Sequence, residues 1–433
     1  MSNKEKSMGY IVFLSVVAAI GGILFGYDTA VISGTTEIVK AQFGLSTGME
    51  GWFVGCVLIG SIIGVLVAGM LSDFLGRKKT MLISALMFSV SAIGCAVCGN
   101  FGQLVLYRMI GGFGIGVVSI VSPIYISEVA PAEKRGTLVS LYQLFITIGF
   151  LLAYLMNYLI LRGAALDATG TELGTRMFNQ EYWRGMFGCE AIPDLLFLVL
   201  IFFIPESPRW LAIRGQRQDK SEEWKALREP GILKAVLIGS AIAILGQFMG
   251  VNAVLYYGPK IFQDAGLSGE GSMFSTVLVG VVTMLTTVIA LLIIDKVGRK
   301  QLVWWGVGGM IVCLLCIGTW FAVGTMPTWF LLTFFLLYVF CTAISISAVV
   351  FVLLSEMYPN RVRGLAMSIA GLALWVGTYL IGQLTPWMLE NLTPAGTFFL
   401  FAFCCLPYLF IMWKYVPETT GKTLEEIENY WKQ

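Results

Sequence analysis

Long apolar segments alternate with short polar connections along the whole chain. An α-helix needs about 20 consecutive apolar residues to cross the hydrocarbon core of a bilayer, and the apolar segments reach this length. The pattern therefore predicts an all-α membrane protein with twelve membrane-spanning helices, six before and six after one sizeable polar break. The expected spans lie near residues 10–32, 52–71, 80–99, 104–125, 137–160, 186–204, 232–257, 273–294, 301–324, 329–354, 364–389 and 396–415.

Basic residues in the connections predict how the spans are oriented. Lys and Arg gather after the even-numbered spans, as at 77–79 and 134–135, and again in the central break. Connections after odd-numbered spans are short and poor in these residues, apart from the longer one at 161–185. Cytoplasmic loops carry an excess of Lys and Arg, so we expect the basic connections and both chain termini to be cytoplasmic.

Short motifs recur at matching places in the two halves. D-x-x-G-R-K follows the second and eighth spans, S-E-x-x-P…R-G the fourth and tenth, and P-E-[ST] the sixth and twelfth. This repetition indicates two homologous six-helix halves that run parallel to one another. The predicted domains are an N-terminal bundle at 1–204, a cytoplasmic linker with short surface helices at 205–231, a C-terminal bundle at 232–415 and a cytoplasmic tail at 416–433.

The repeated motifs also place acids beside cations at the cytoplasmic ends of the helices. We expect Asp73 and Glu128 to pair with Arg77 and Arg135 across loops. The second half offers an equivalent set, namely Asp295, Arg299, Glu356 and Arg363. Such pairs form a cytoplasmic gate that closes in one conformation and opens in the other. The alternative is topological anchoring by positive charge alone, which gives the acids no role.

Composition agrees with a membrane protein and narrows the chemistry. Of the 433 residues, 57% are hydrophobic and 12% are charged, whereas soluble domains carry about 25% charged residues. Histidine is absent, so proton chemistry near neutral pH needs a perturbed carboxylate, Lys, Cys or Tyr. No Ser/His, metal or phosphate-loop constellation stands out, and we expect no enzyme activity, no cofactor, no metal site and no nucleic-acid partner.

One glycine-rich stretch and one acid within the spans call for an explanation. The sequence "GGFGIG" (111–116) resembles a nucleotide loop, but no strand precedes it, and we interpret it as a glycine seam for close helix packing. Asp28 lies within "GGILFGYDTAVISG" (21–34), with no basic residue nearby in the sequence. A buried carboxylate is costly unless it is paired or protonated. Asp28 is therefore either a proton carrier or a structural carboxylate satisfied by hydrogen bonds.

Nine strings carry a resemblance to a known family. They are "GGILFGYDTAVISG", "SDFLGRKK", "YRMIGGFGIGV", "SPIYISEVAPAEKRG", "PESPRWL", "GVNAVLYY", "DKVGRK", "LLSEMYP" and "VPETTGKTLEEIE". With them the chain resembles the sugar porter family of the major facilitator superfamily, and most closely its bacterial proton-coupled pentose and hexose symporters. The resemblance implies two pseudo-symmetric six-helix bundles and import of a monosaccharide with protons by alternating access. It also implies a monomer in the bacterial inner membrane, with sugar, proton and lipid as partners.

The resemblance assigns roles to individual residues. Arg108 resembles the basic partner of Asp28, and this pair would couple protons to transport. The residues that resemble the family's sugar contacts are Phe25, Gln143, Gln247, Asn252, Tyr256 and Trp375. Amides and hydroxyls suit hydrogen bonds to a sugar, and aromatic faces suit its C–H surfaces. Gly250 is expected to loosen the seventh helix between these residues.

Several positions depart from the family pattern. Phe150, Gly246 and Leu374 stand where the symporters usually carry polar residues, and Thr283 stands where they usually carry Asn. Residues 346–348 read Ile-Ser-Ala in place of Trp-Gly-Pro. A lost amide leaves a sugar hydroxyl unpaired at a cost of about 1–3 kcal/mol. Three readings therefore stay open: a sugar symporter with a rearranged pocket, a facilitator or porter of a different polyol or less polar metabolite, or an altered member with impaired sugar transport.

Overall fold

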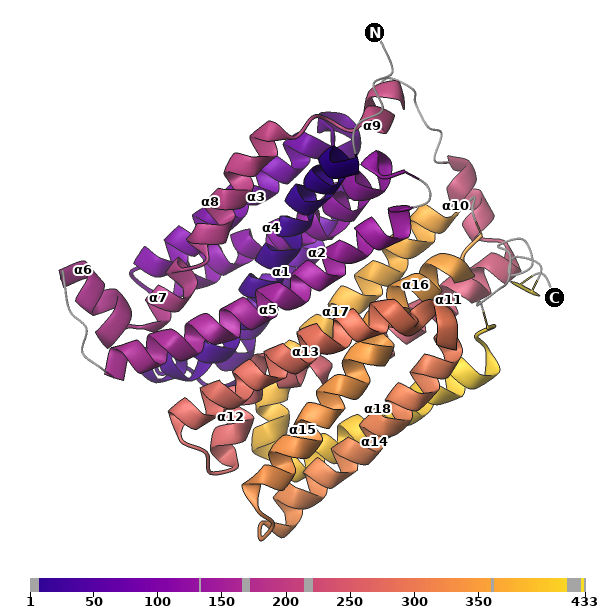
Figure 1. The fold of residues 1–433 in the computed structure, drawn as a ribbon. Coiled ribbons are helices and arrows are strands. Elements are labelled where there is room, and N and C mark those ends of the chain that lie inside the picture. The colour runs from indigo at the N-terminus through magenta and orange to yellow at the C-terminus, as the bar shows by residue number, and fades with distance from the viewer. Residues whose placement is uncertain are drawn as a thin grey trace. The chain divides into compact units, whose positions relative to one another are not determined.

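Nearly all of the described chain is helical. The computed structural model describes residues 8–131, 134–165, 172–213, 221–359, 362–418 and 430–431 (Figure 1). Among these residues, 12 helical segments are long and apolar enough to cross a membrane. This confirms the twelve predicted spans.

The first six spans contain single helices except for the last one. Their helices are α1 (Met8–Phe43), α2 (Thr47–Leu75), α3 (Arg77–Val97), α4 (Phe101–Val129), α5 (Arg135–Ala165), and α7 (Trp183–Gly188) followed by α8 (Ala191–Phe203). Before α7 come the one-turn helix α6 (Glu172–Thr175) and the π-helical η2 (Arg176–Gln180). Several helices extend well past the apolar segments that predict them, because a helix continues into polar residues beyond the hydrocarbon core.

The last six spans include two interrupted helices. Their elements are α11 (Pro230–Gln247) with α12 (Val251–Asp264), α13 (Gly269–Val297), α14 (Arg299–Val323), α15 (Thr328–Thr342) with η3 (Ala343–Ser347) and α16 (Ala348–Met357), α17 (Arg363–Asn391) and α18 (Thr393–Lys414). Between the halves lie the short helices α9 (Pro208–Ile213) and α10 (Ser221–Leu227). Both lie within the range of the predicted linker at 205–231.

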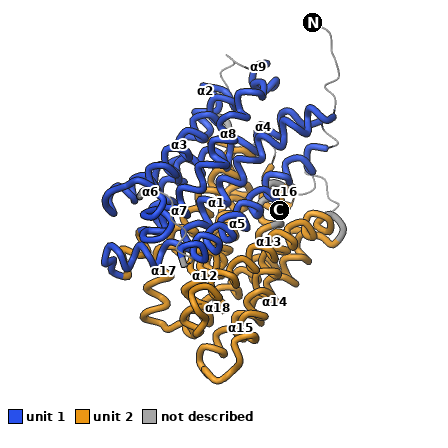
Figure 2. The backbone as a smooth tube through the Cα atoms, turned by 60° about the vertical axis from the view of Figure 1, so that its left-hand side comes forward, with its two compact units in different colours: residues 1–46, 53–216 blue, residues 47–52, 217–433 orange. Residues whose placement is uncertain are grey.

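The chain forms two compact units (Figure 2). One consists of residues 1–46 and 53–216, and the other of residues 47–52 and 217–433. The boundary near 216 falls inside the predicted linker, while the exact domain limits stay a prediction. The start of α2 was not expected in the second unit. There the buried Glu50 accepts a hydrogen bond from Lys260 Nζ at 2.9 Å.

Close glycine contacts hold the first unit together. A side chain on Gly112 of α4 would overlap the carbonyl oxygen of Val57 on α2, and one on Gly116 would overlap that of Ser61. These backbones approach so closely because no Cβ atom separates them. The predicted glycine seam at 111–116 is confirmed. Gly26 makes the same kind of approach from α1 to α5, so α1 lies tightly packed at the point where it carries Asp28.

The two interruptions in the second unit lie inside membrane spans. Gly250 has a φ of 90°, a left-handed conformation that glycine adopts freely, and it separates α11 from α12. The break confirms that the seventh helix loosens at Gly250. In the tenth span, the five π-helical residues of η3 interrupt the α-helix between α15 and α16. Irregular turns of this kind in transmembrane helices commonly mark functional sites.

Candidate functional site

A buried ion pair joins α1 to α4 in the first unit. Arg108 Nη1 donates a hydrogen bond to Asp28 Oδ1, and both terminal nitrogens of Arg108 lie 3.4 Å from the Asp28 carbonyl oxygen. Asp28 is 1% exposed and Arg108 is fully buried. The guanidinium also lies over the Phe187 ring, 5.1 Å from its centroid. The pair is thus shielded from bulk solvent, and each charge depends on the other for compensation.

Two further buried acids lie on the sixth span, and the sequence reasoning missed both. Glu190 precedes α8 and is 2% exposed, while Asp194 lies one turn later and is fully buried. Glu190 interacts electrostatically with both Asp194 and Arg108. The signal was present in the string "CEAIPDLLF" (189–197), because acids within a membrane span are costly and are functional candidates by default.

Just before the sixth span, Glu181 holds two arginines. Glu181 accepts hydrogen bonds from Arg176 Nε at 2.7 Å and from Arg184 Nε at 2.6 Å. Partial burial opposes ionisation of this carboxyl, but the hydrogen bonds from the two arginines prevail and lower its pKa. Arg184 also donates to the carbonyl oxygens of Ala96 and Cys98, at 3.2 and 2.7 Å. Arg184 is therefore engaged away from the acids on α8.

The predicted sugar contacts of the first unit lie on two helices that pack against each other. Phe25 is on α1 and Gln143 is on α5. Both are partly exposed, whereas Leu24 beside Phe25 and Tyr142 beside Gln143 are buried. Partial exposure of Phe25 and Gln143 is compatible with side chains that line a cavity.

The predicted contacts of the second unit gather around the break between α11 and α12. Asn252 Nδ2 donates to Gln247 Oε1 at 2.6 Å, so the two amide side chains are hydrogen-bonded to each other across the break. The Thr378 hydroxyl on α17 donates to the same Gln247 oxygen at 3.2 Å. Trp375 lies one turn before Thr378 and is buried, and Tyr256 lies one turn after Asn252 and is buried. The sequence did not indicate that Thr378 joins this group.

The departures from the family pattern leave this region more apolar. At Gly246 a Cβ atom would meet Ile346 at 3.6 Å and the Tyr408 ring at 3.8 Å, which are ordinary van der Waals distances. Thr283 donates its hydroxyl to the Val279 carbonyl of its own helix at 2.7 Å. Leu374 and Phe150 are partly exposed.

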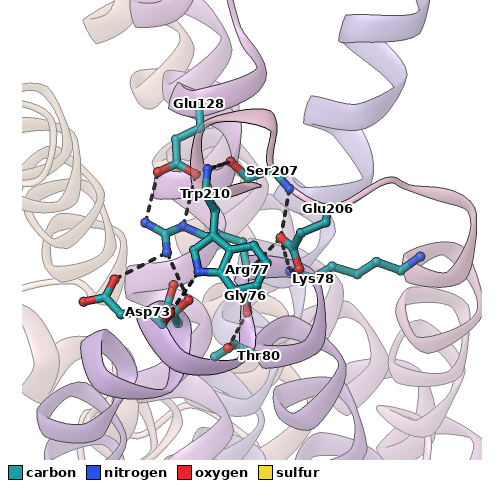
Figure 3. A network of polar contacts seen from close by, with 10 residues as sticks. Asp73, Gly76, Arg77, Lys78, Thr80, Glu128, Glu206, Ser207 and Trp210 are labelled. Atoms are coloured by element: carbon teal, nitrogen blue, oxygen red, sulfur yellow. Dashed lines mark hydrogen bonds and ion pairs between the residues drawn. The ribbon is translucent and has the colours of Figure 1, made fainter. Parts of the chain in front are cut away.

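At one end of the first unit, Arg77 is the centre of a polar network (Figure 3). Its Nε and Nη2 contact the two Glu128 carboxylate oxygens at 3.1 and 3.0 Å, and Nη1 lies 3.4 Å from Asp73 Oδ1. Arg77 and Glu128 are both largely buried, whereas the Asp73 side chain is half exposed. A bidentate, buried guanidinium–carboxylate pair is among the stronger ion pairs in proteins.

The P-E-S motif belongs to the same network, which the sequence did not reveal. Glu206 accepts the backbone N–H groups of Arg77 and Lys78, at 2.9 and 3.1 Å, at the start of α3. A carboxylate here pairs the free N–H groups and favours the positive end of the helix. Gly76 has a φ of 95°, and a side chain there would overlap the Glu206 carboxylate. Ser207 then donates to Glu128 Oε2 at 2.5 Å and so connects the two acids.

Part of this arrangement recurs among the described residues of the second unit. Arg299 Nη2 contacts Glu356 Oε1 at 3.1 Å, after a glycine, Gly298, with a φ of 98°. Arg363 donates instead to the carbonyl oxygen of Tyr358 at 3.4 Å. The Asp295 side chain lies outside the described residues.

Arg135 differs from its expected placement beside Glu128. It is exposed at the start of α5 and makes no ion pair with the residues that the structure describes. Glu128 is paired with Arg77 instead.

Comparison with known proteins identifies the family. The profile of the family described as "Sugar (and other) transporter" matches residues 14–230 and 217–431. The chain belongs to this family. This sugar transporter is 36% identical to the arabinose-proton symporter of Bacillus subtilis, over 99% of its own length and 96% of the relative's. It is also 36% identical to the D-xylose-proton symporter of Escherichia coli K12, over 99% and 97% of the two chains.

Solved structures agree with that assignment. The inward open structure of the xylose transporter XylE from E. coli has a TM-score of 0.82 and 36% identity, covering 98% of this chain and 100% of that chain. A XylE structure described as a major facilitator superfamily protein matches with a TM-score of 0.80. The predicted fold class is confirmed. The protein is a multi-pass membrane transporter of the major facilitator fold, and not an enzyme.

Proposed function

We propose that this transporter imports a monosaccharide, a pentose or a hexose, together with protons by alternating access. The observation that carries the proposal is the buried Asp28–Arg108 pair within a membrane span. The printed names of relatives that match nearly the full chain, an arabinose-proton and a xylose-proton symporter, support it.

The pair can act as a proton-operated switch. Beside Arg108 the Asp28 carboxylate is ionised and its charge is compensated. Protonation removes the negative charge and weakens the attraction between α1 and α4. In the proposed cycle Asp28 gains a proton from the outside, and the two helices can then separate. The proton leaves on the inside, so its movement is coupled to the conformational change.

Sugar is bound by the amides and aromatic rings described above. In the first unit the proposed sugar contacts are Gln143 and Phe25. In the second unit they are Gln247, Asn252 and Trp375. The Asn252–Gln247–Thr378 hydrogen bonds fix the Gln247 amide before sugar arrives, which reduces the entropy lost on binding. Tyr256 adds an aromatic face.

The charged networks of the two units form the proposed cytoplasmic gate. Arg77 with Glu128, and Arg299 with Glu356, are the ion pairs that must rearrange as the cytoplasmic ends of the helices open. Asp73 joins the first pair. The assignment of Arg135, Asp295 and Arg363 to the gate stays a prediction.

We place the protein in the bacterial inner membrane, with both termini cytoplasmic. The excess of Lys and Arg after even-numbered spans supports this orientation. The named relatives come from bacteria. Membrane lipid, sugar and proton are its expected partners, and we expect a monomer.

Substitution of Gln247 tests the proposed sugar site. Gln247→Ala removes an amide that Asn252 and Thr378 hold in place, so affinity for the transported monosaccharide should fall about tenfold, the effect of losing about 1.4 kcal/mol. Binding of xylose, arabinose and glucose to the purified protein can be measured by calorimetry. The exposed Gln263→Ala is the matched control and should bind as the unchanged protein does.

A different result would favour a second function. If none of these sugars binds the unchanged protein, the alternative is a facilitator or porter of a less polar metabolite. The apolar surroundings of Gly246, formed by Ile346 and the Tyr408 ring, favour that alternative. A panel of less hydroxylated polyols would then be screened by thermal shift, since a true ligand raises stability by mass action.

A further inference from the structure

The sixth span presents two acids to the interior of the first unit. Glu190, Asp194, Phe197 and Ile201 follow each other at helical spacing, and all are buried. The opposite side of α8 carries exposed apolar residues such as Ile192, at 71% exposure. The acids therefore face neighbouring helices and not the lipid. Exposure of these carboxyl groups to lipid would be costly.

Three of the four carboxyl oxygens of these acids lack hydrogen-bond partners within the described part of the chain. Among the described residues, neither oxygen of Asp194 and not Oε1 of Glu190 receives a hydrogen bond. An ionised carboxylate without donors or a counter-ion is far more costly to bury than a neutral acid. The absence of donors thus favours a protonated form of this pair.

The two arginines near these acids each have another acidic partner. Arg108, on α4, is paired with Asp28, and Arg184, on α7, is held by Glu181 and two backbone carbonyls. Among the described residues, Tyr27 on α1 interacts with both acids and Cys95 on α3 interacts with Glu190, while Cys189 precedes Glu190 in the chain. These side chains are neutral in their ordinary state.

The charge balance follows from these contacts. Asp28, Glu190 and Asp194 are three buried carboxyls, and both Asp28 and Glu190 interact with the Arg108 guanidinium. Full ionisation would leave two uncompensated negative charges in a region of low dielectric. Positions four apart on a helix have Cβ atoms about 5–6 Å from each other, and like charges at such distances disfavour joint ionisation.

We propose that Glu190 and Asp194 form a second proton-binding site in this transporter, which holds a proton separate from the one carried by Asp28. Asp194 is the residue that creates the site, because Glu190 alone could share the charge of Arg108 with Asp28. The part this site has in transport rests on the proposed function, whereas the presence of its proton does not.

Infrared spectroscopy of the purified protein in lipid tests the site without any transport. At neutral pH the unchanged protein should show the C=O stretching band of a protonated carboxyl, identified by its shift in D2O. Asp194→Asn should remove or shift this band, and Glu190→Gln should alter the same band because the two acids share the proton. The exposed Asp264→Asn should leave it unchanged.

Two outcomes would overturn the proposal. One is an unchanged protein with no protonated carboxyl band at neutral pH. The other is a band with the same position and intensity in Asp194→Asn. If Asp194→Asn does not yield folded protein, Asp194→Glu keeps the carboxyl on a longer side chain, and its band must then shift. The infrared bands do not depend on whether the protein couples sugar transport to protons. The second proton-binding site and the proposed function are therefore tested separately.

Discussion

Asp28→Asn is expected to abolish uphill accumulation of sugar while sparing sugar exchange across the membrane. Asparagine keeps the size and much of the hydrogen bonding of the side chain but cannot bind and release a proton. An inward gradient of one pH unit can drive about tenfold accumulation when one proton enters with each sugar. The variant should show an accumulation ratio of about one, with counterflow still measurable, in proteoliposomes with a fixed pH gradient.

A matched substitution separates this effect from general damage. Asp264→Asn makes the same change at an exposed position at the end of α12 and should accumulate sugar as the unchanged protein does. Undiminished accumulation by Asp28→Asn would exclude Asp28 as the proton carrier. Loss of both accumulation and counterflow would show a structural role for the Asp28–Arg108 pair instead.

Arg77→Met is expected to destabilise the protein more than any other single change in the gate network. It leaves the Glu128 carboxylate, which is 5% exposed, without its bidentate partner. Removing one member of a buried ion pair costs about 3–5 kcal/mol, because the remaining charge is uncompensated. The melting temperature of the purified protein in detergent should fall clearly. The melting temperature of Arg77→Lys should fall less, since lysine keeps the positive charge but loses the bidentate geometry.

Arg135→Met is the control for this experiment. Arg135 is an exposed arginine at the start of α5, and exposed charges contribute about 0–1 kcal/mol. The melting temperature of Arg135→Met should be close to that of the unchanged protein. Equal melting temperatures for Arg77→Met and Arg135→Met would contradict the structural weight given to the Arg77–Glu128 pair. The double variant Arg77→Met with Glu128→Leu should recover part of the loss, because no buried charge then remains.

The sequence predicts those features that depend on local pattern. Span count follows from apolar length, and the turn at Gly76 recurs at Gly298 because both lie in the same repeated motif. The seam at 111–116 was recognisable since glycines clustered on one helix have few other uses in a membrane. The break at Gly250 also follows from a single residue type at one position.

Features that depend on tertiary register could not be predicted in this way. Spacing shows that Glu128 is near the end of a span, but not whether Arg77 or Arg135 reaches it. Glu206 was visible as part of a repeat, yet its place at the start of α3 depends on how the sixth span packs. The partner of Asp28 came from family resemblance, because 80 residues separate it from Arg108.

Recording external pH while sugar enters proteoliposomes tests the central claim most directly. The liposomes are lightly buffered, carry no imposed proton gradient, and receive a monosaccharide that binds the purified protein. The account predicts that the medium becomes more alkaline as sugar enters, and that Asp28→Asn gives no such change. Sugar entry through the unchanged protein without any change in external pH would contradict proton coupling.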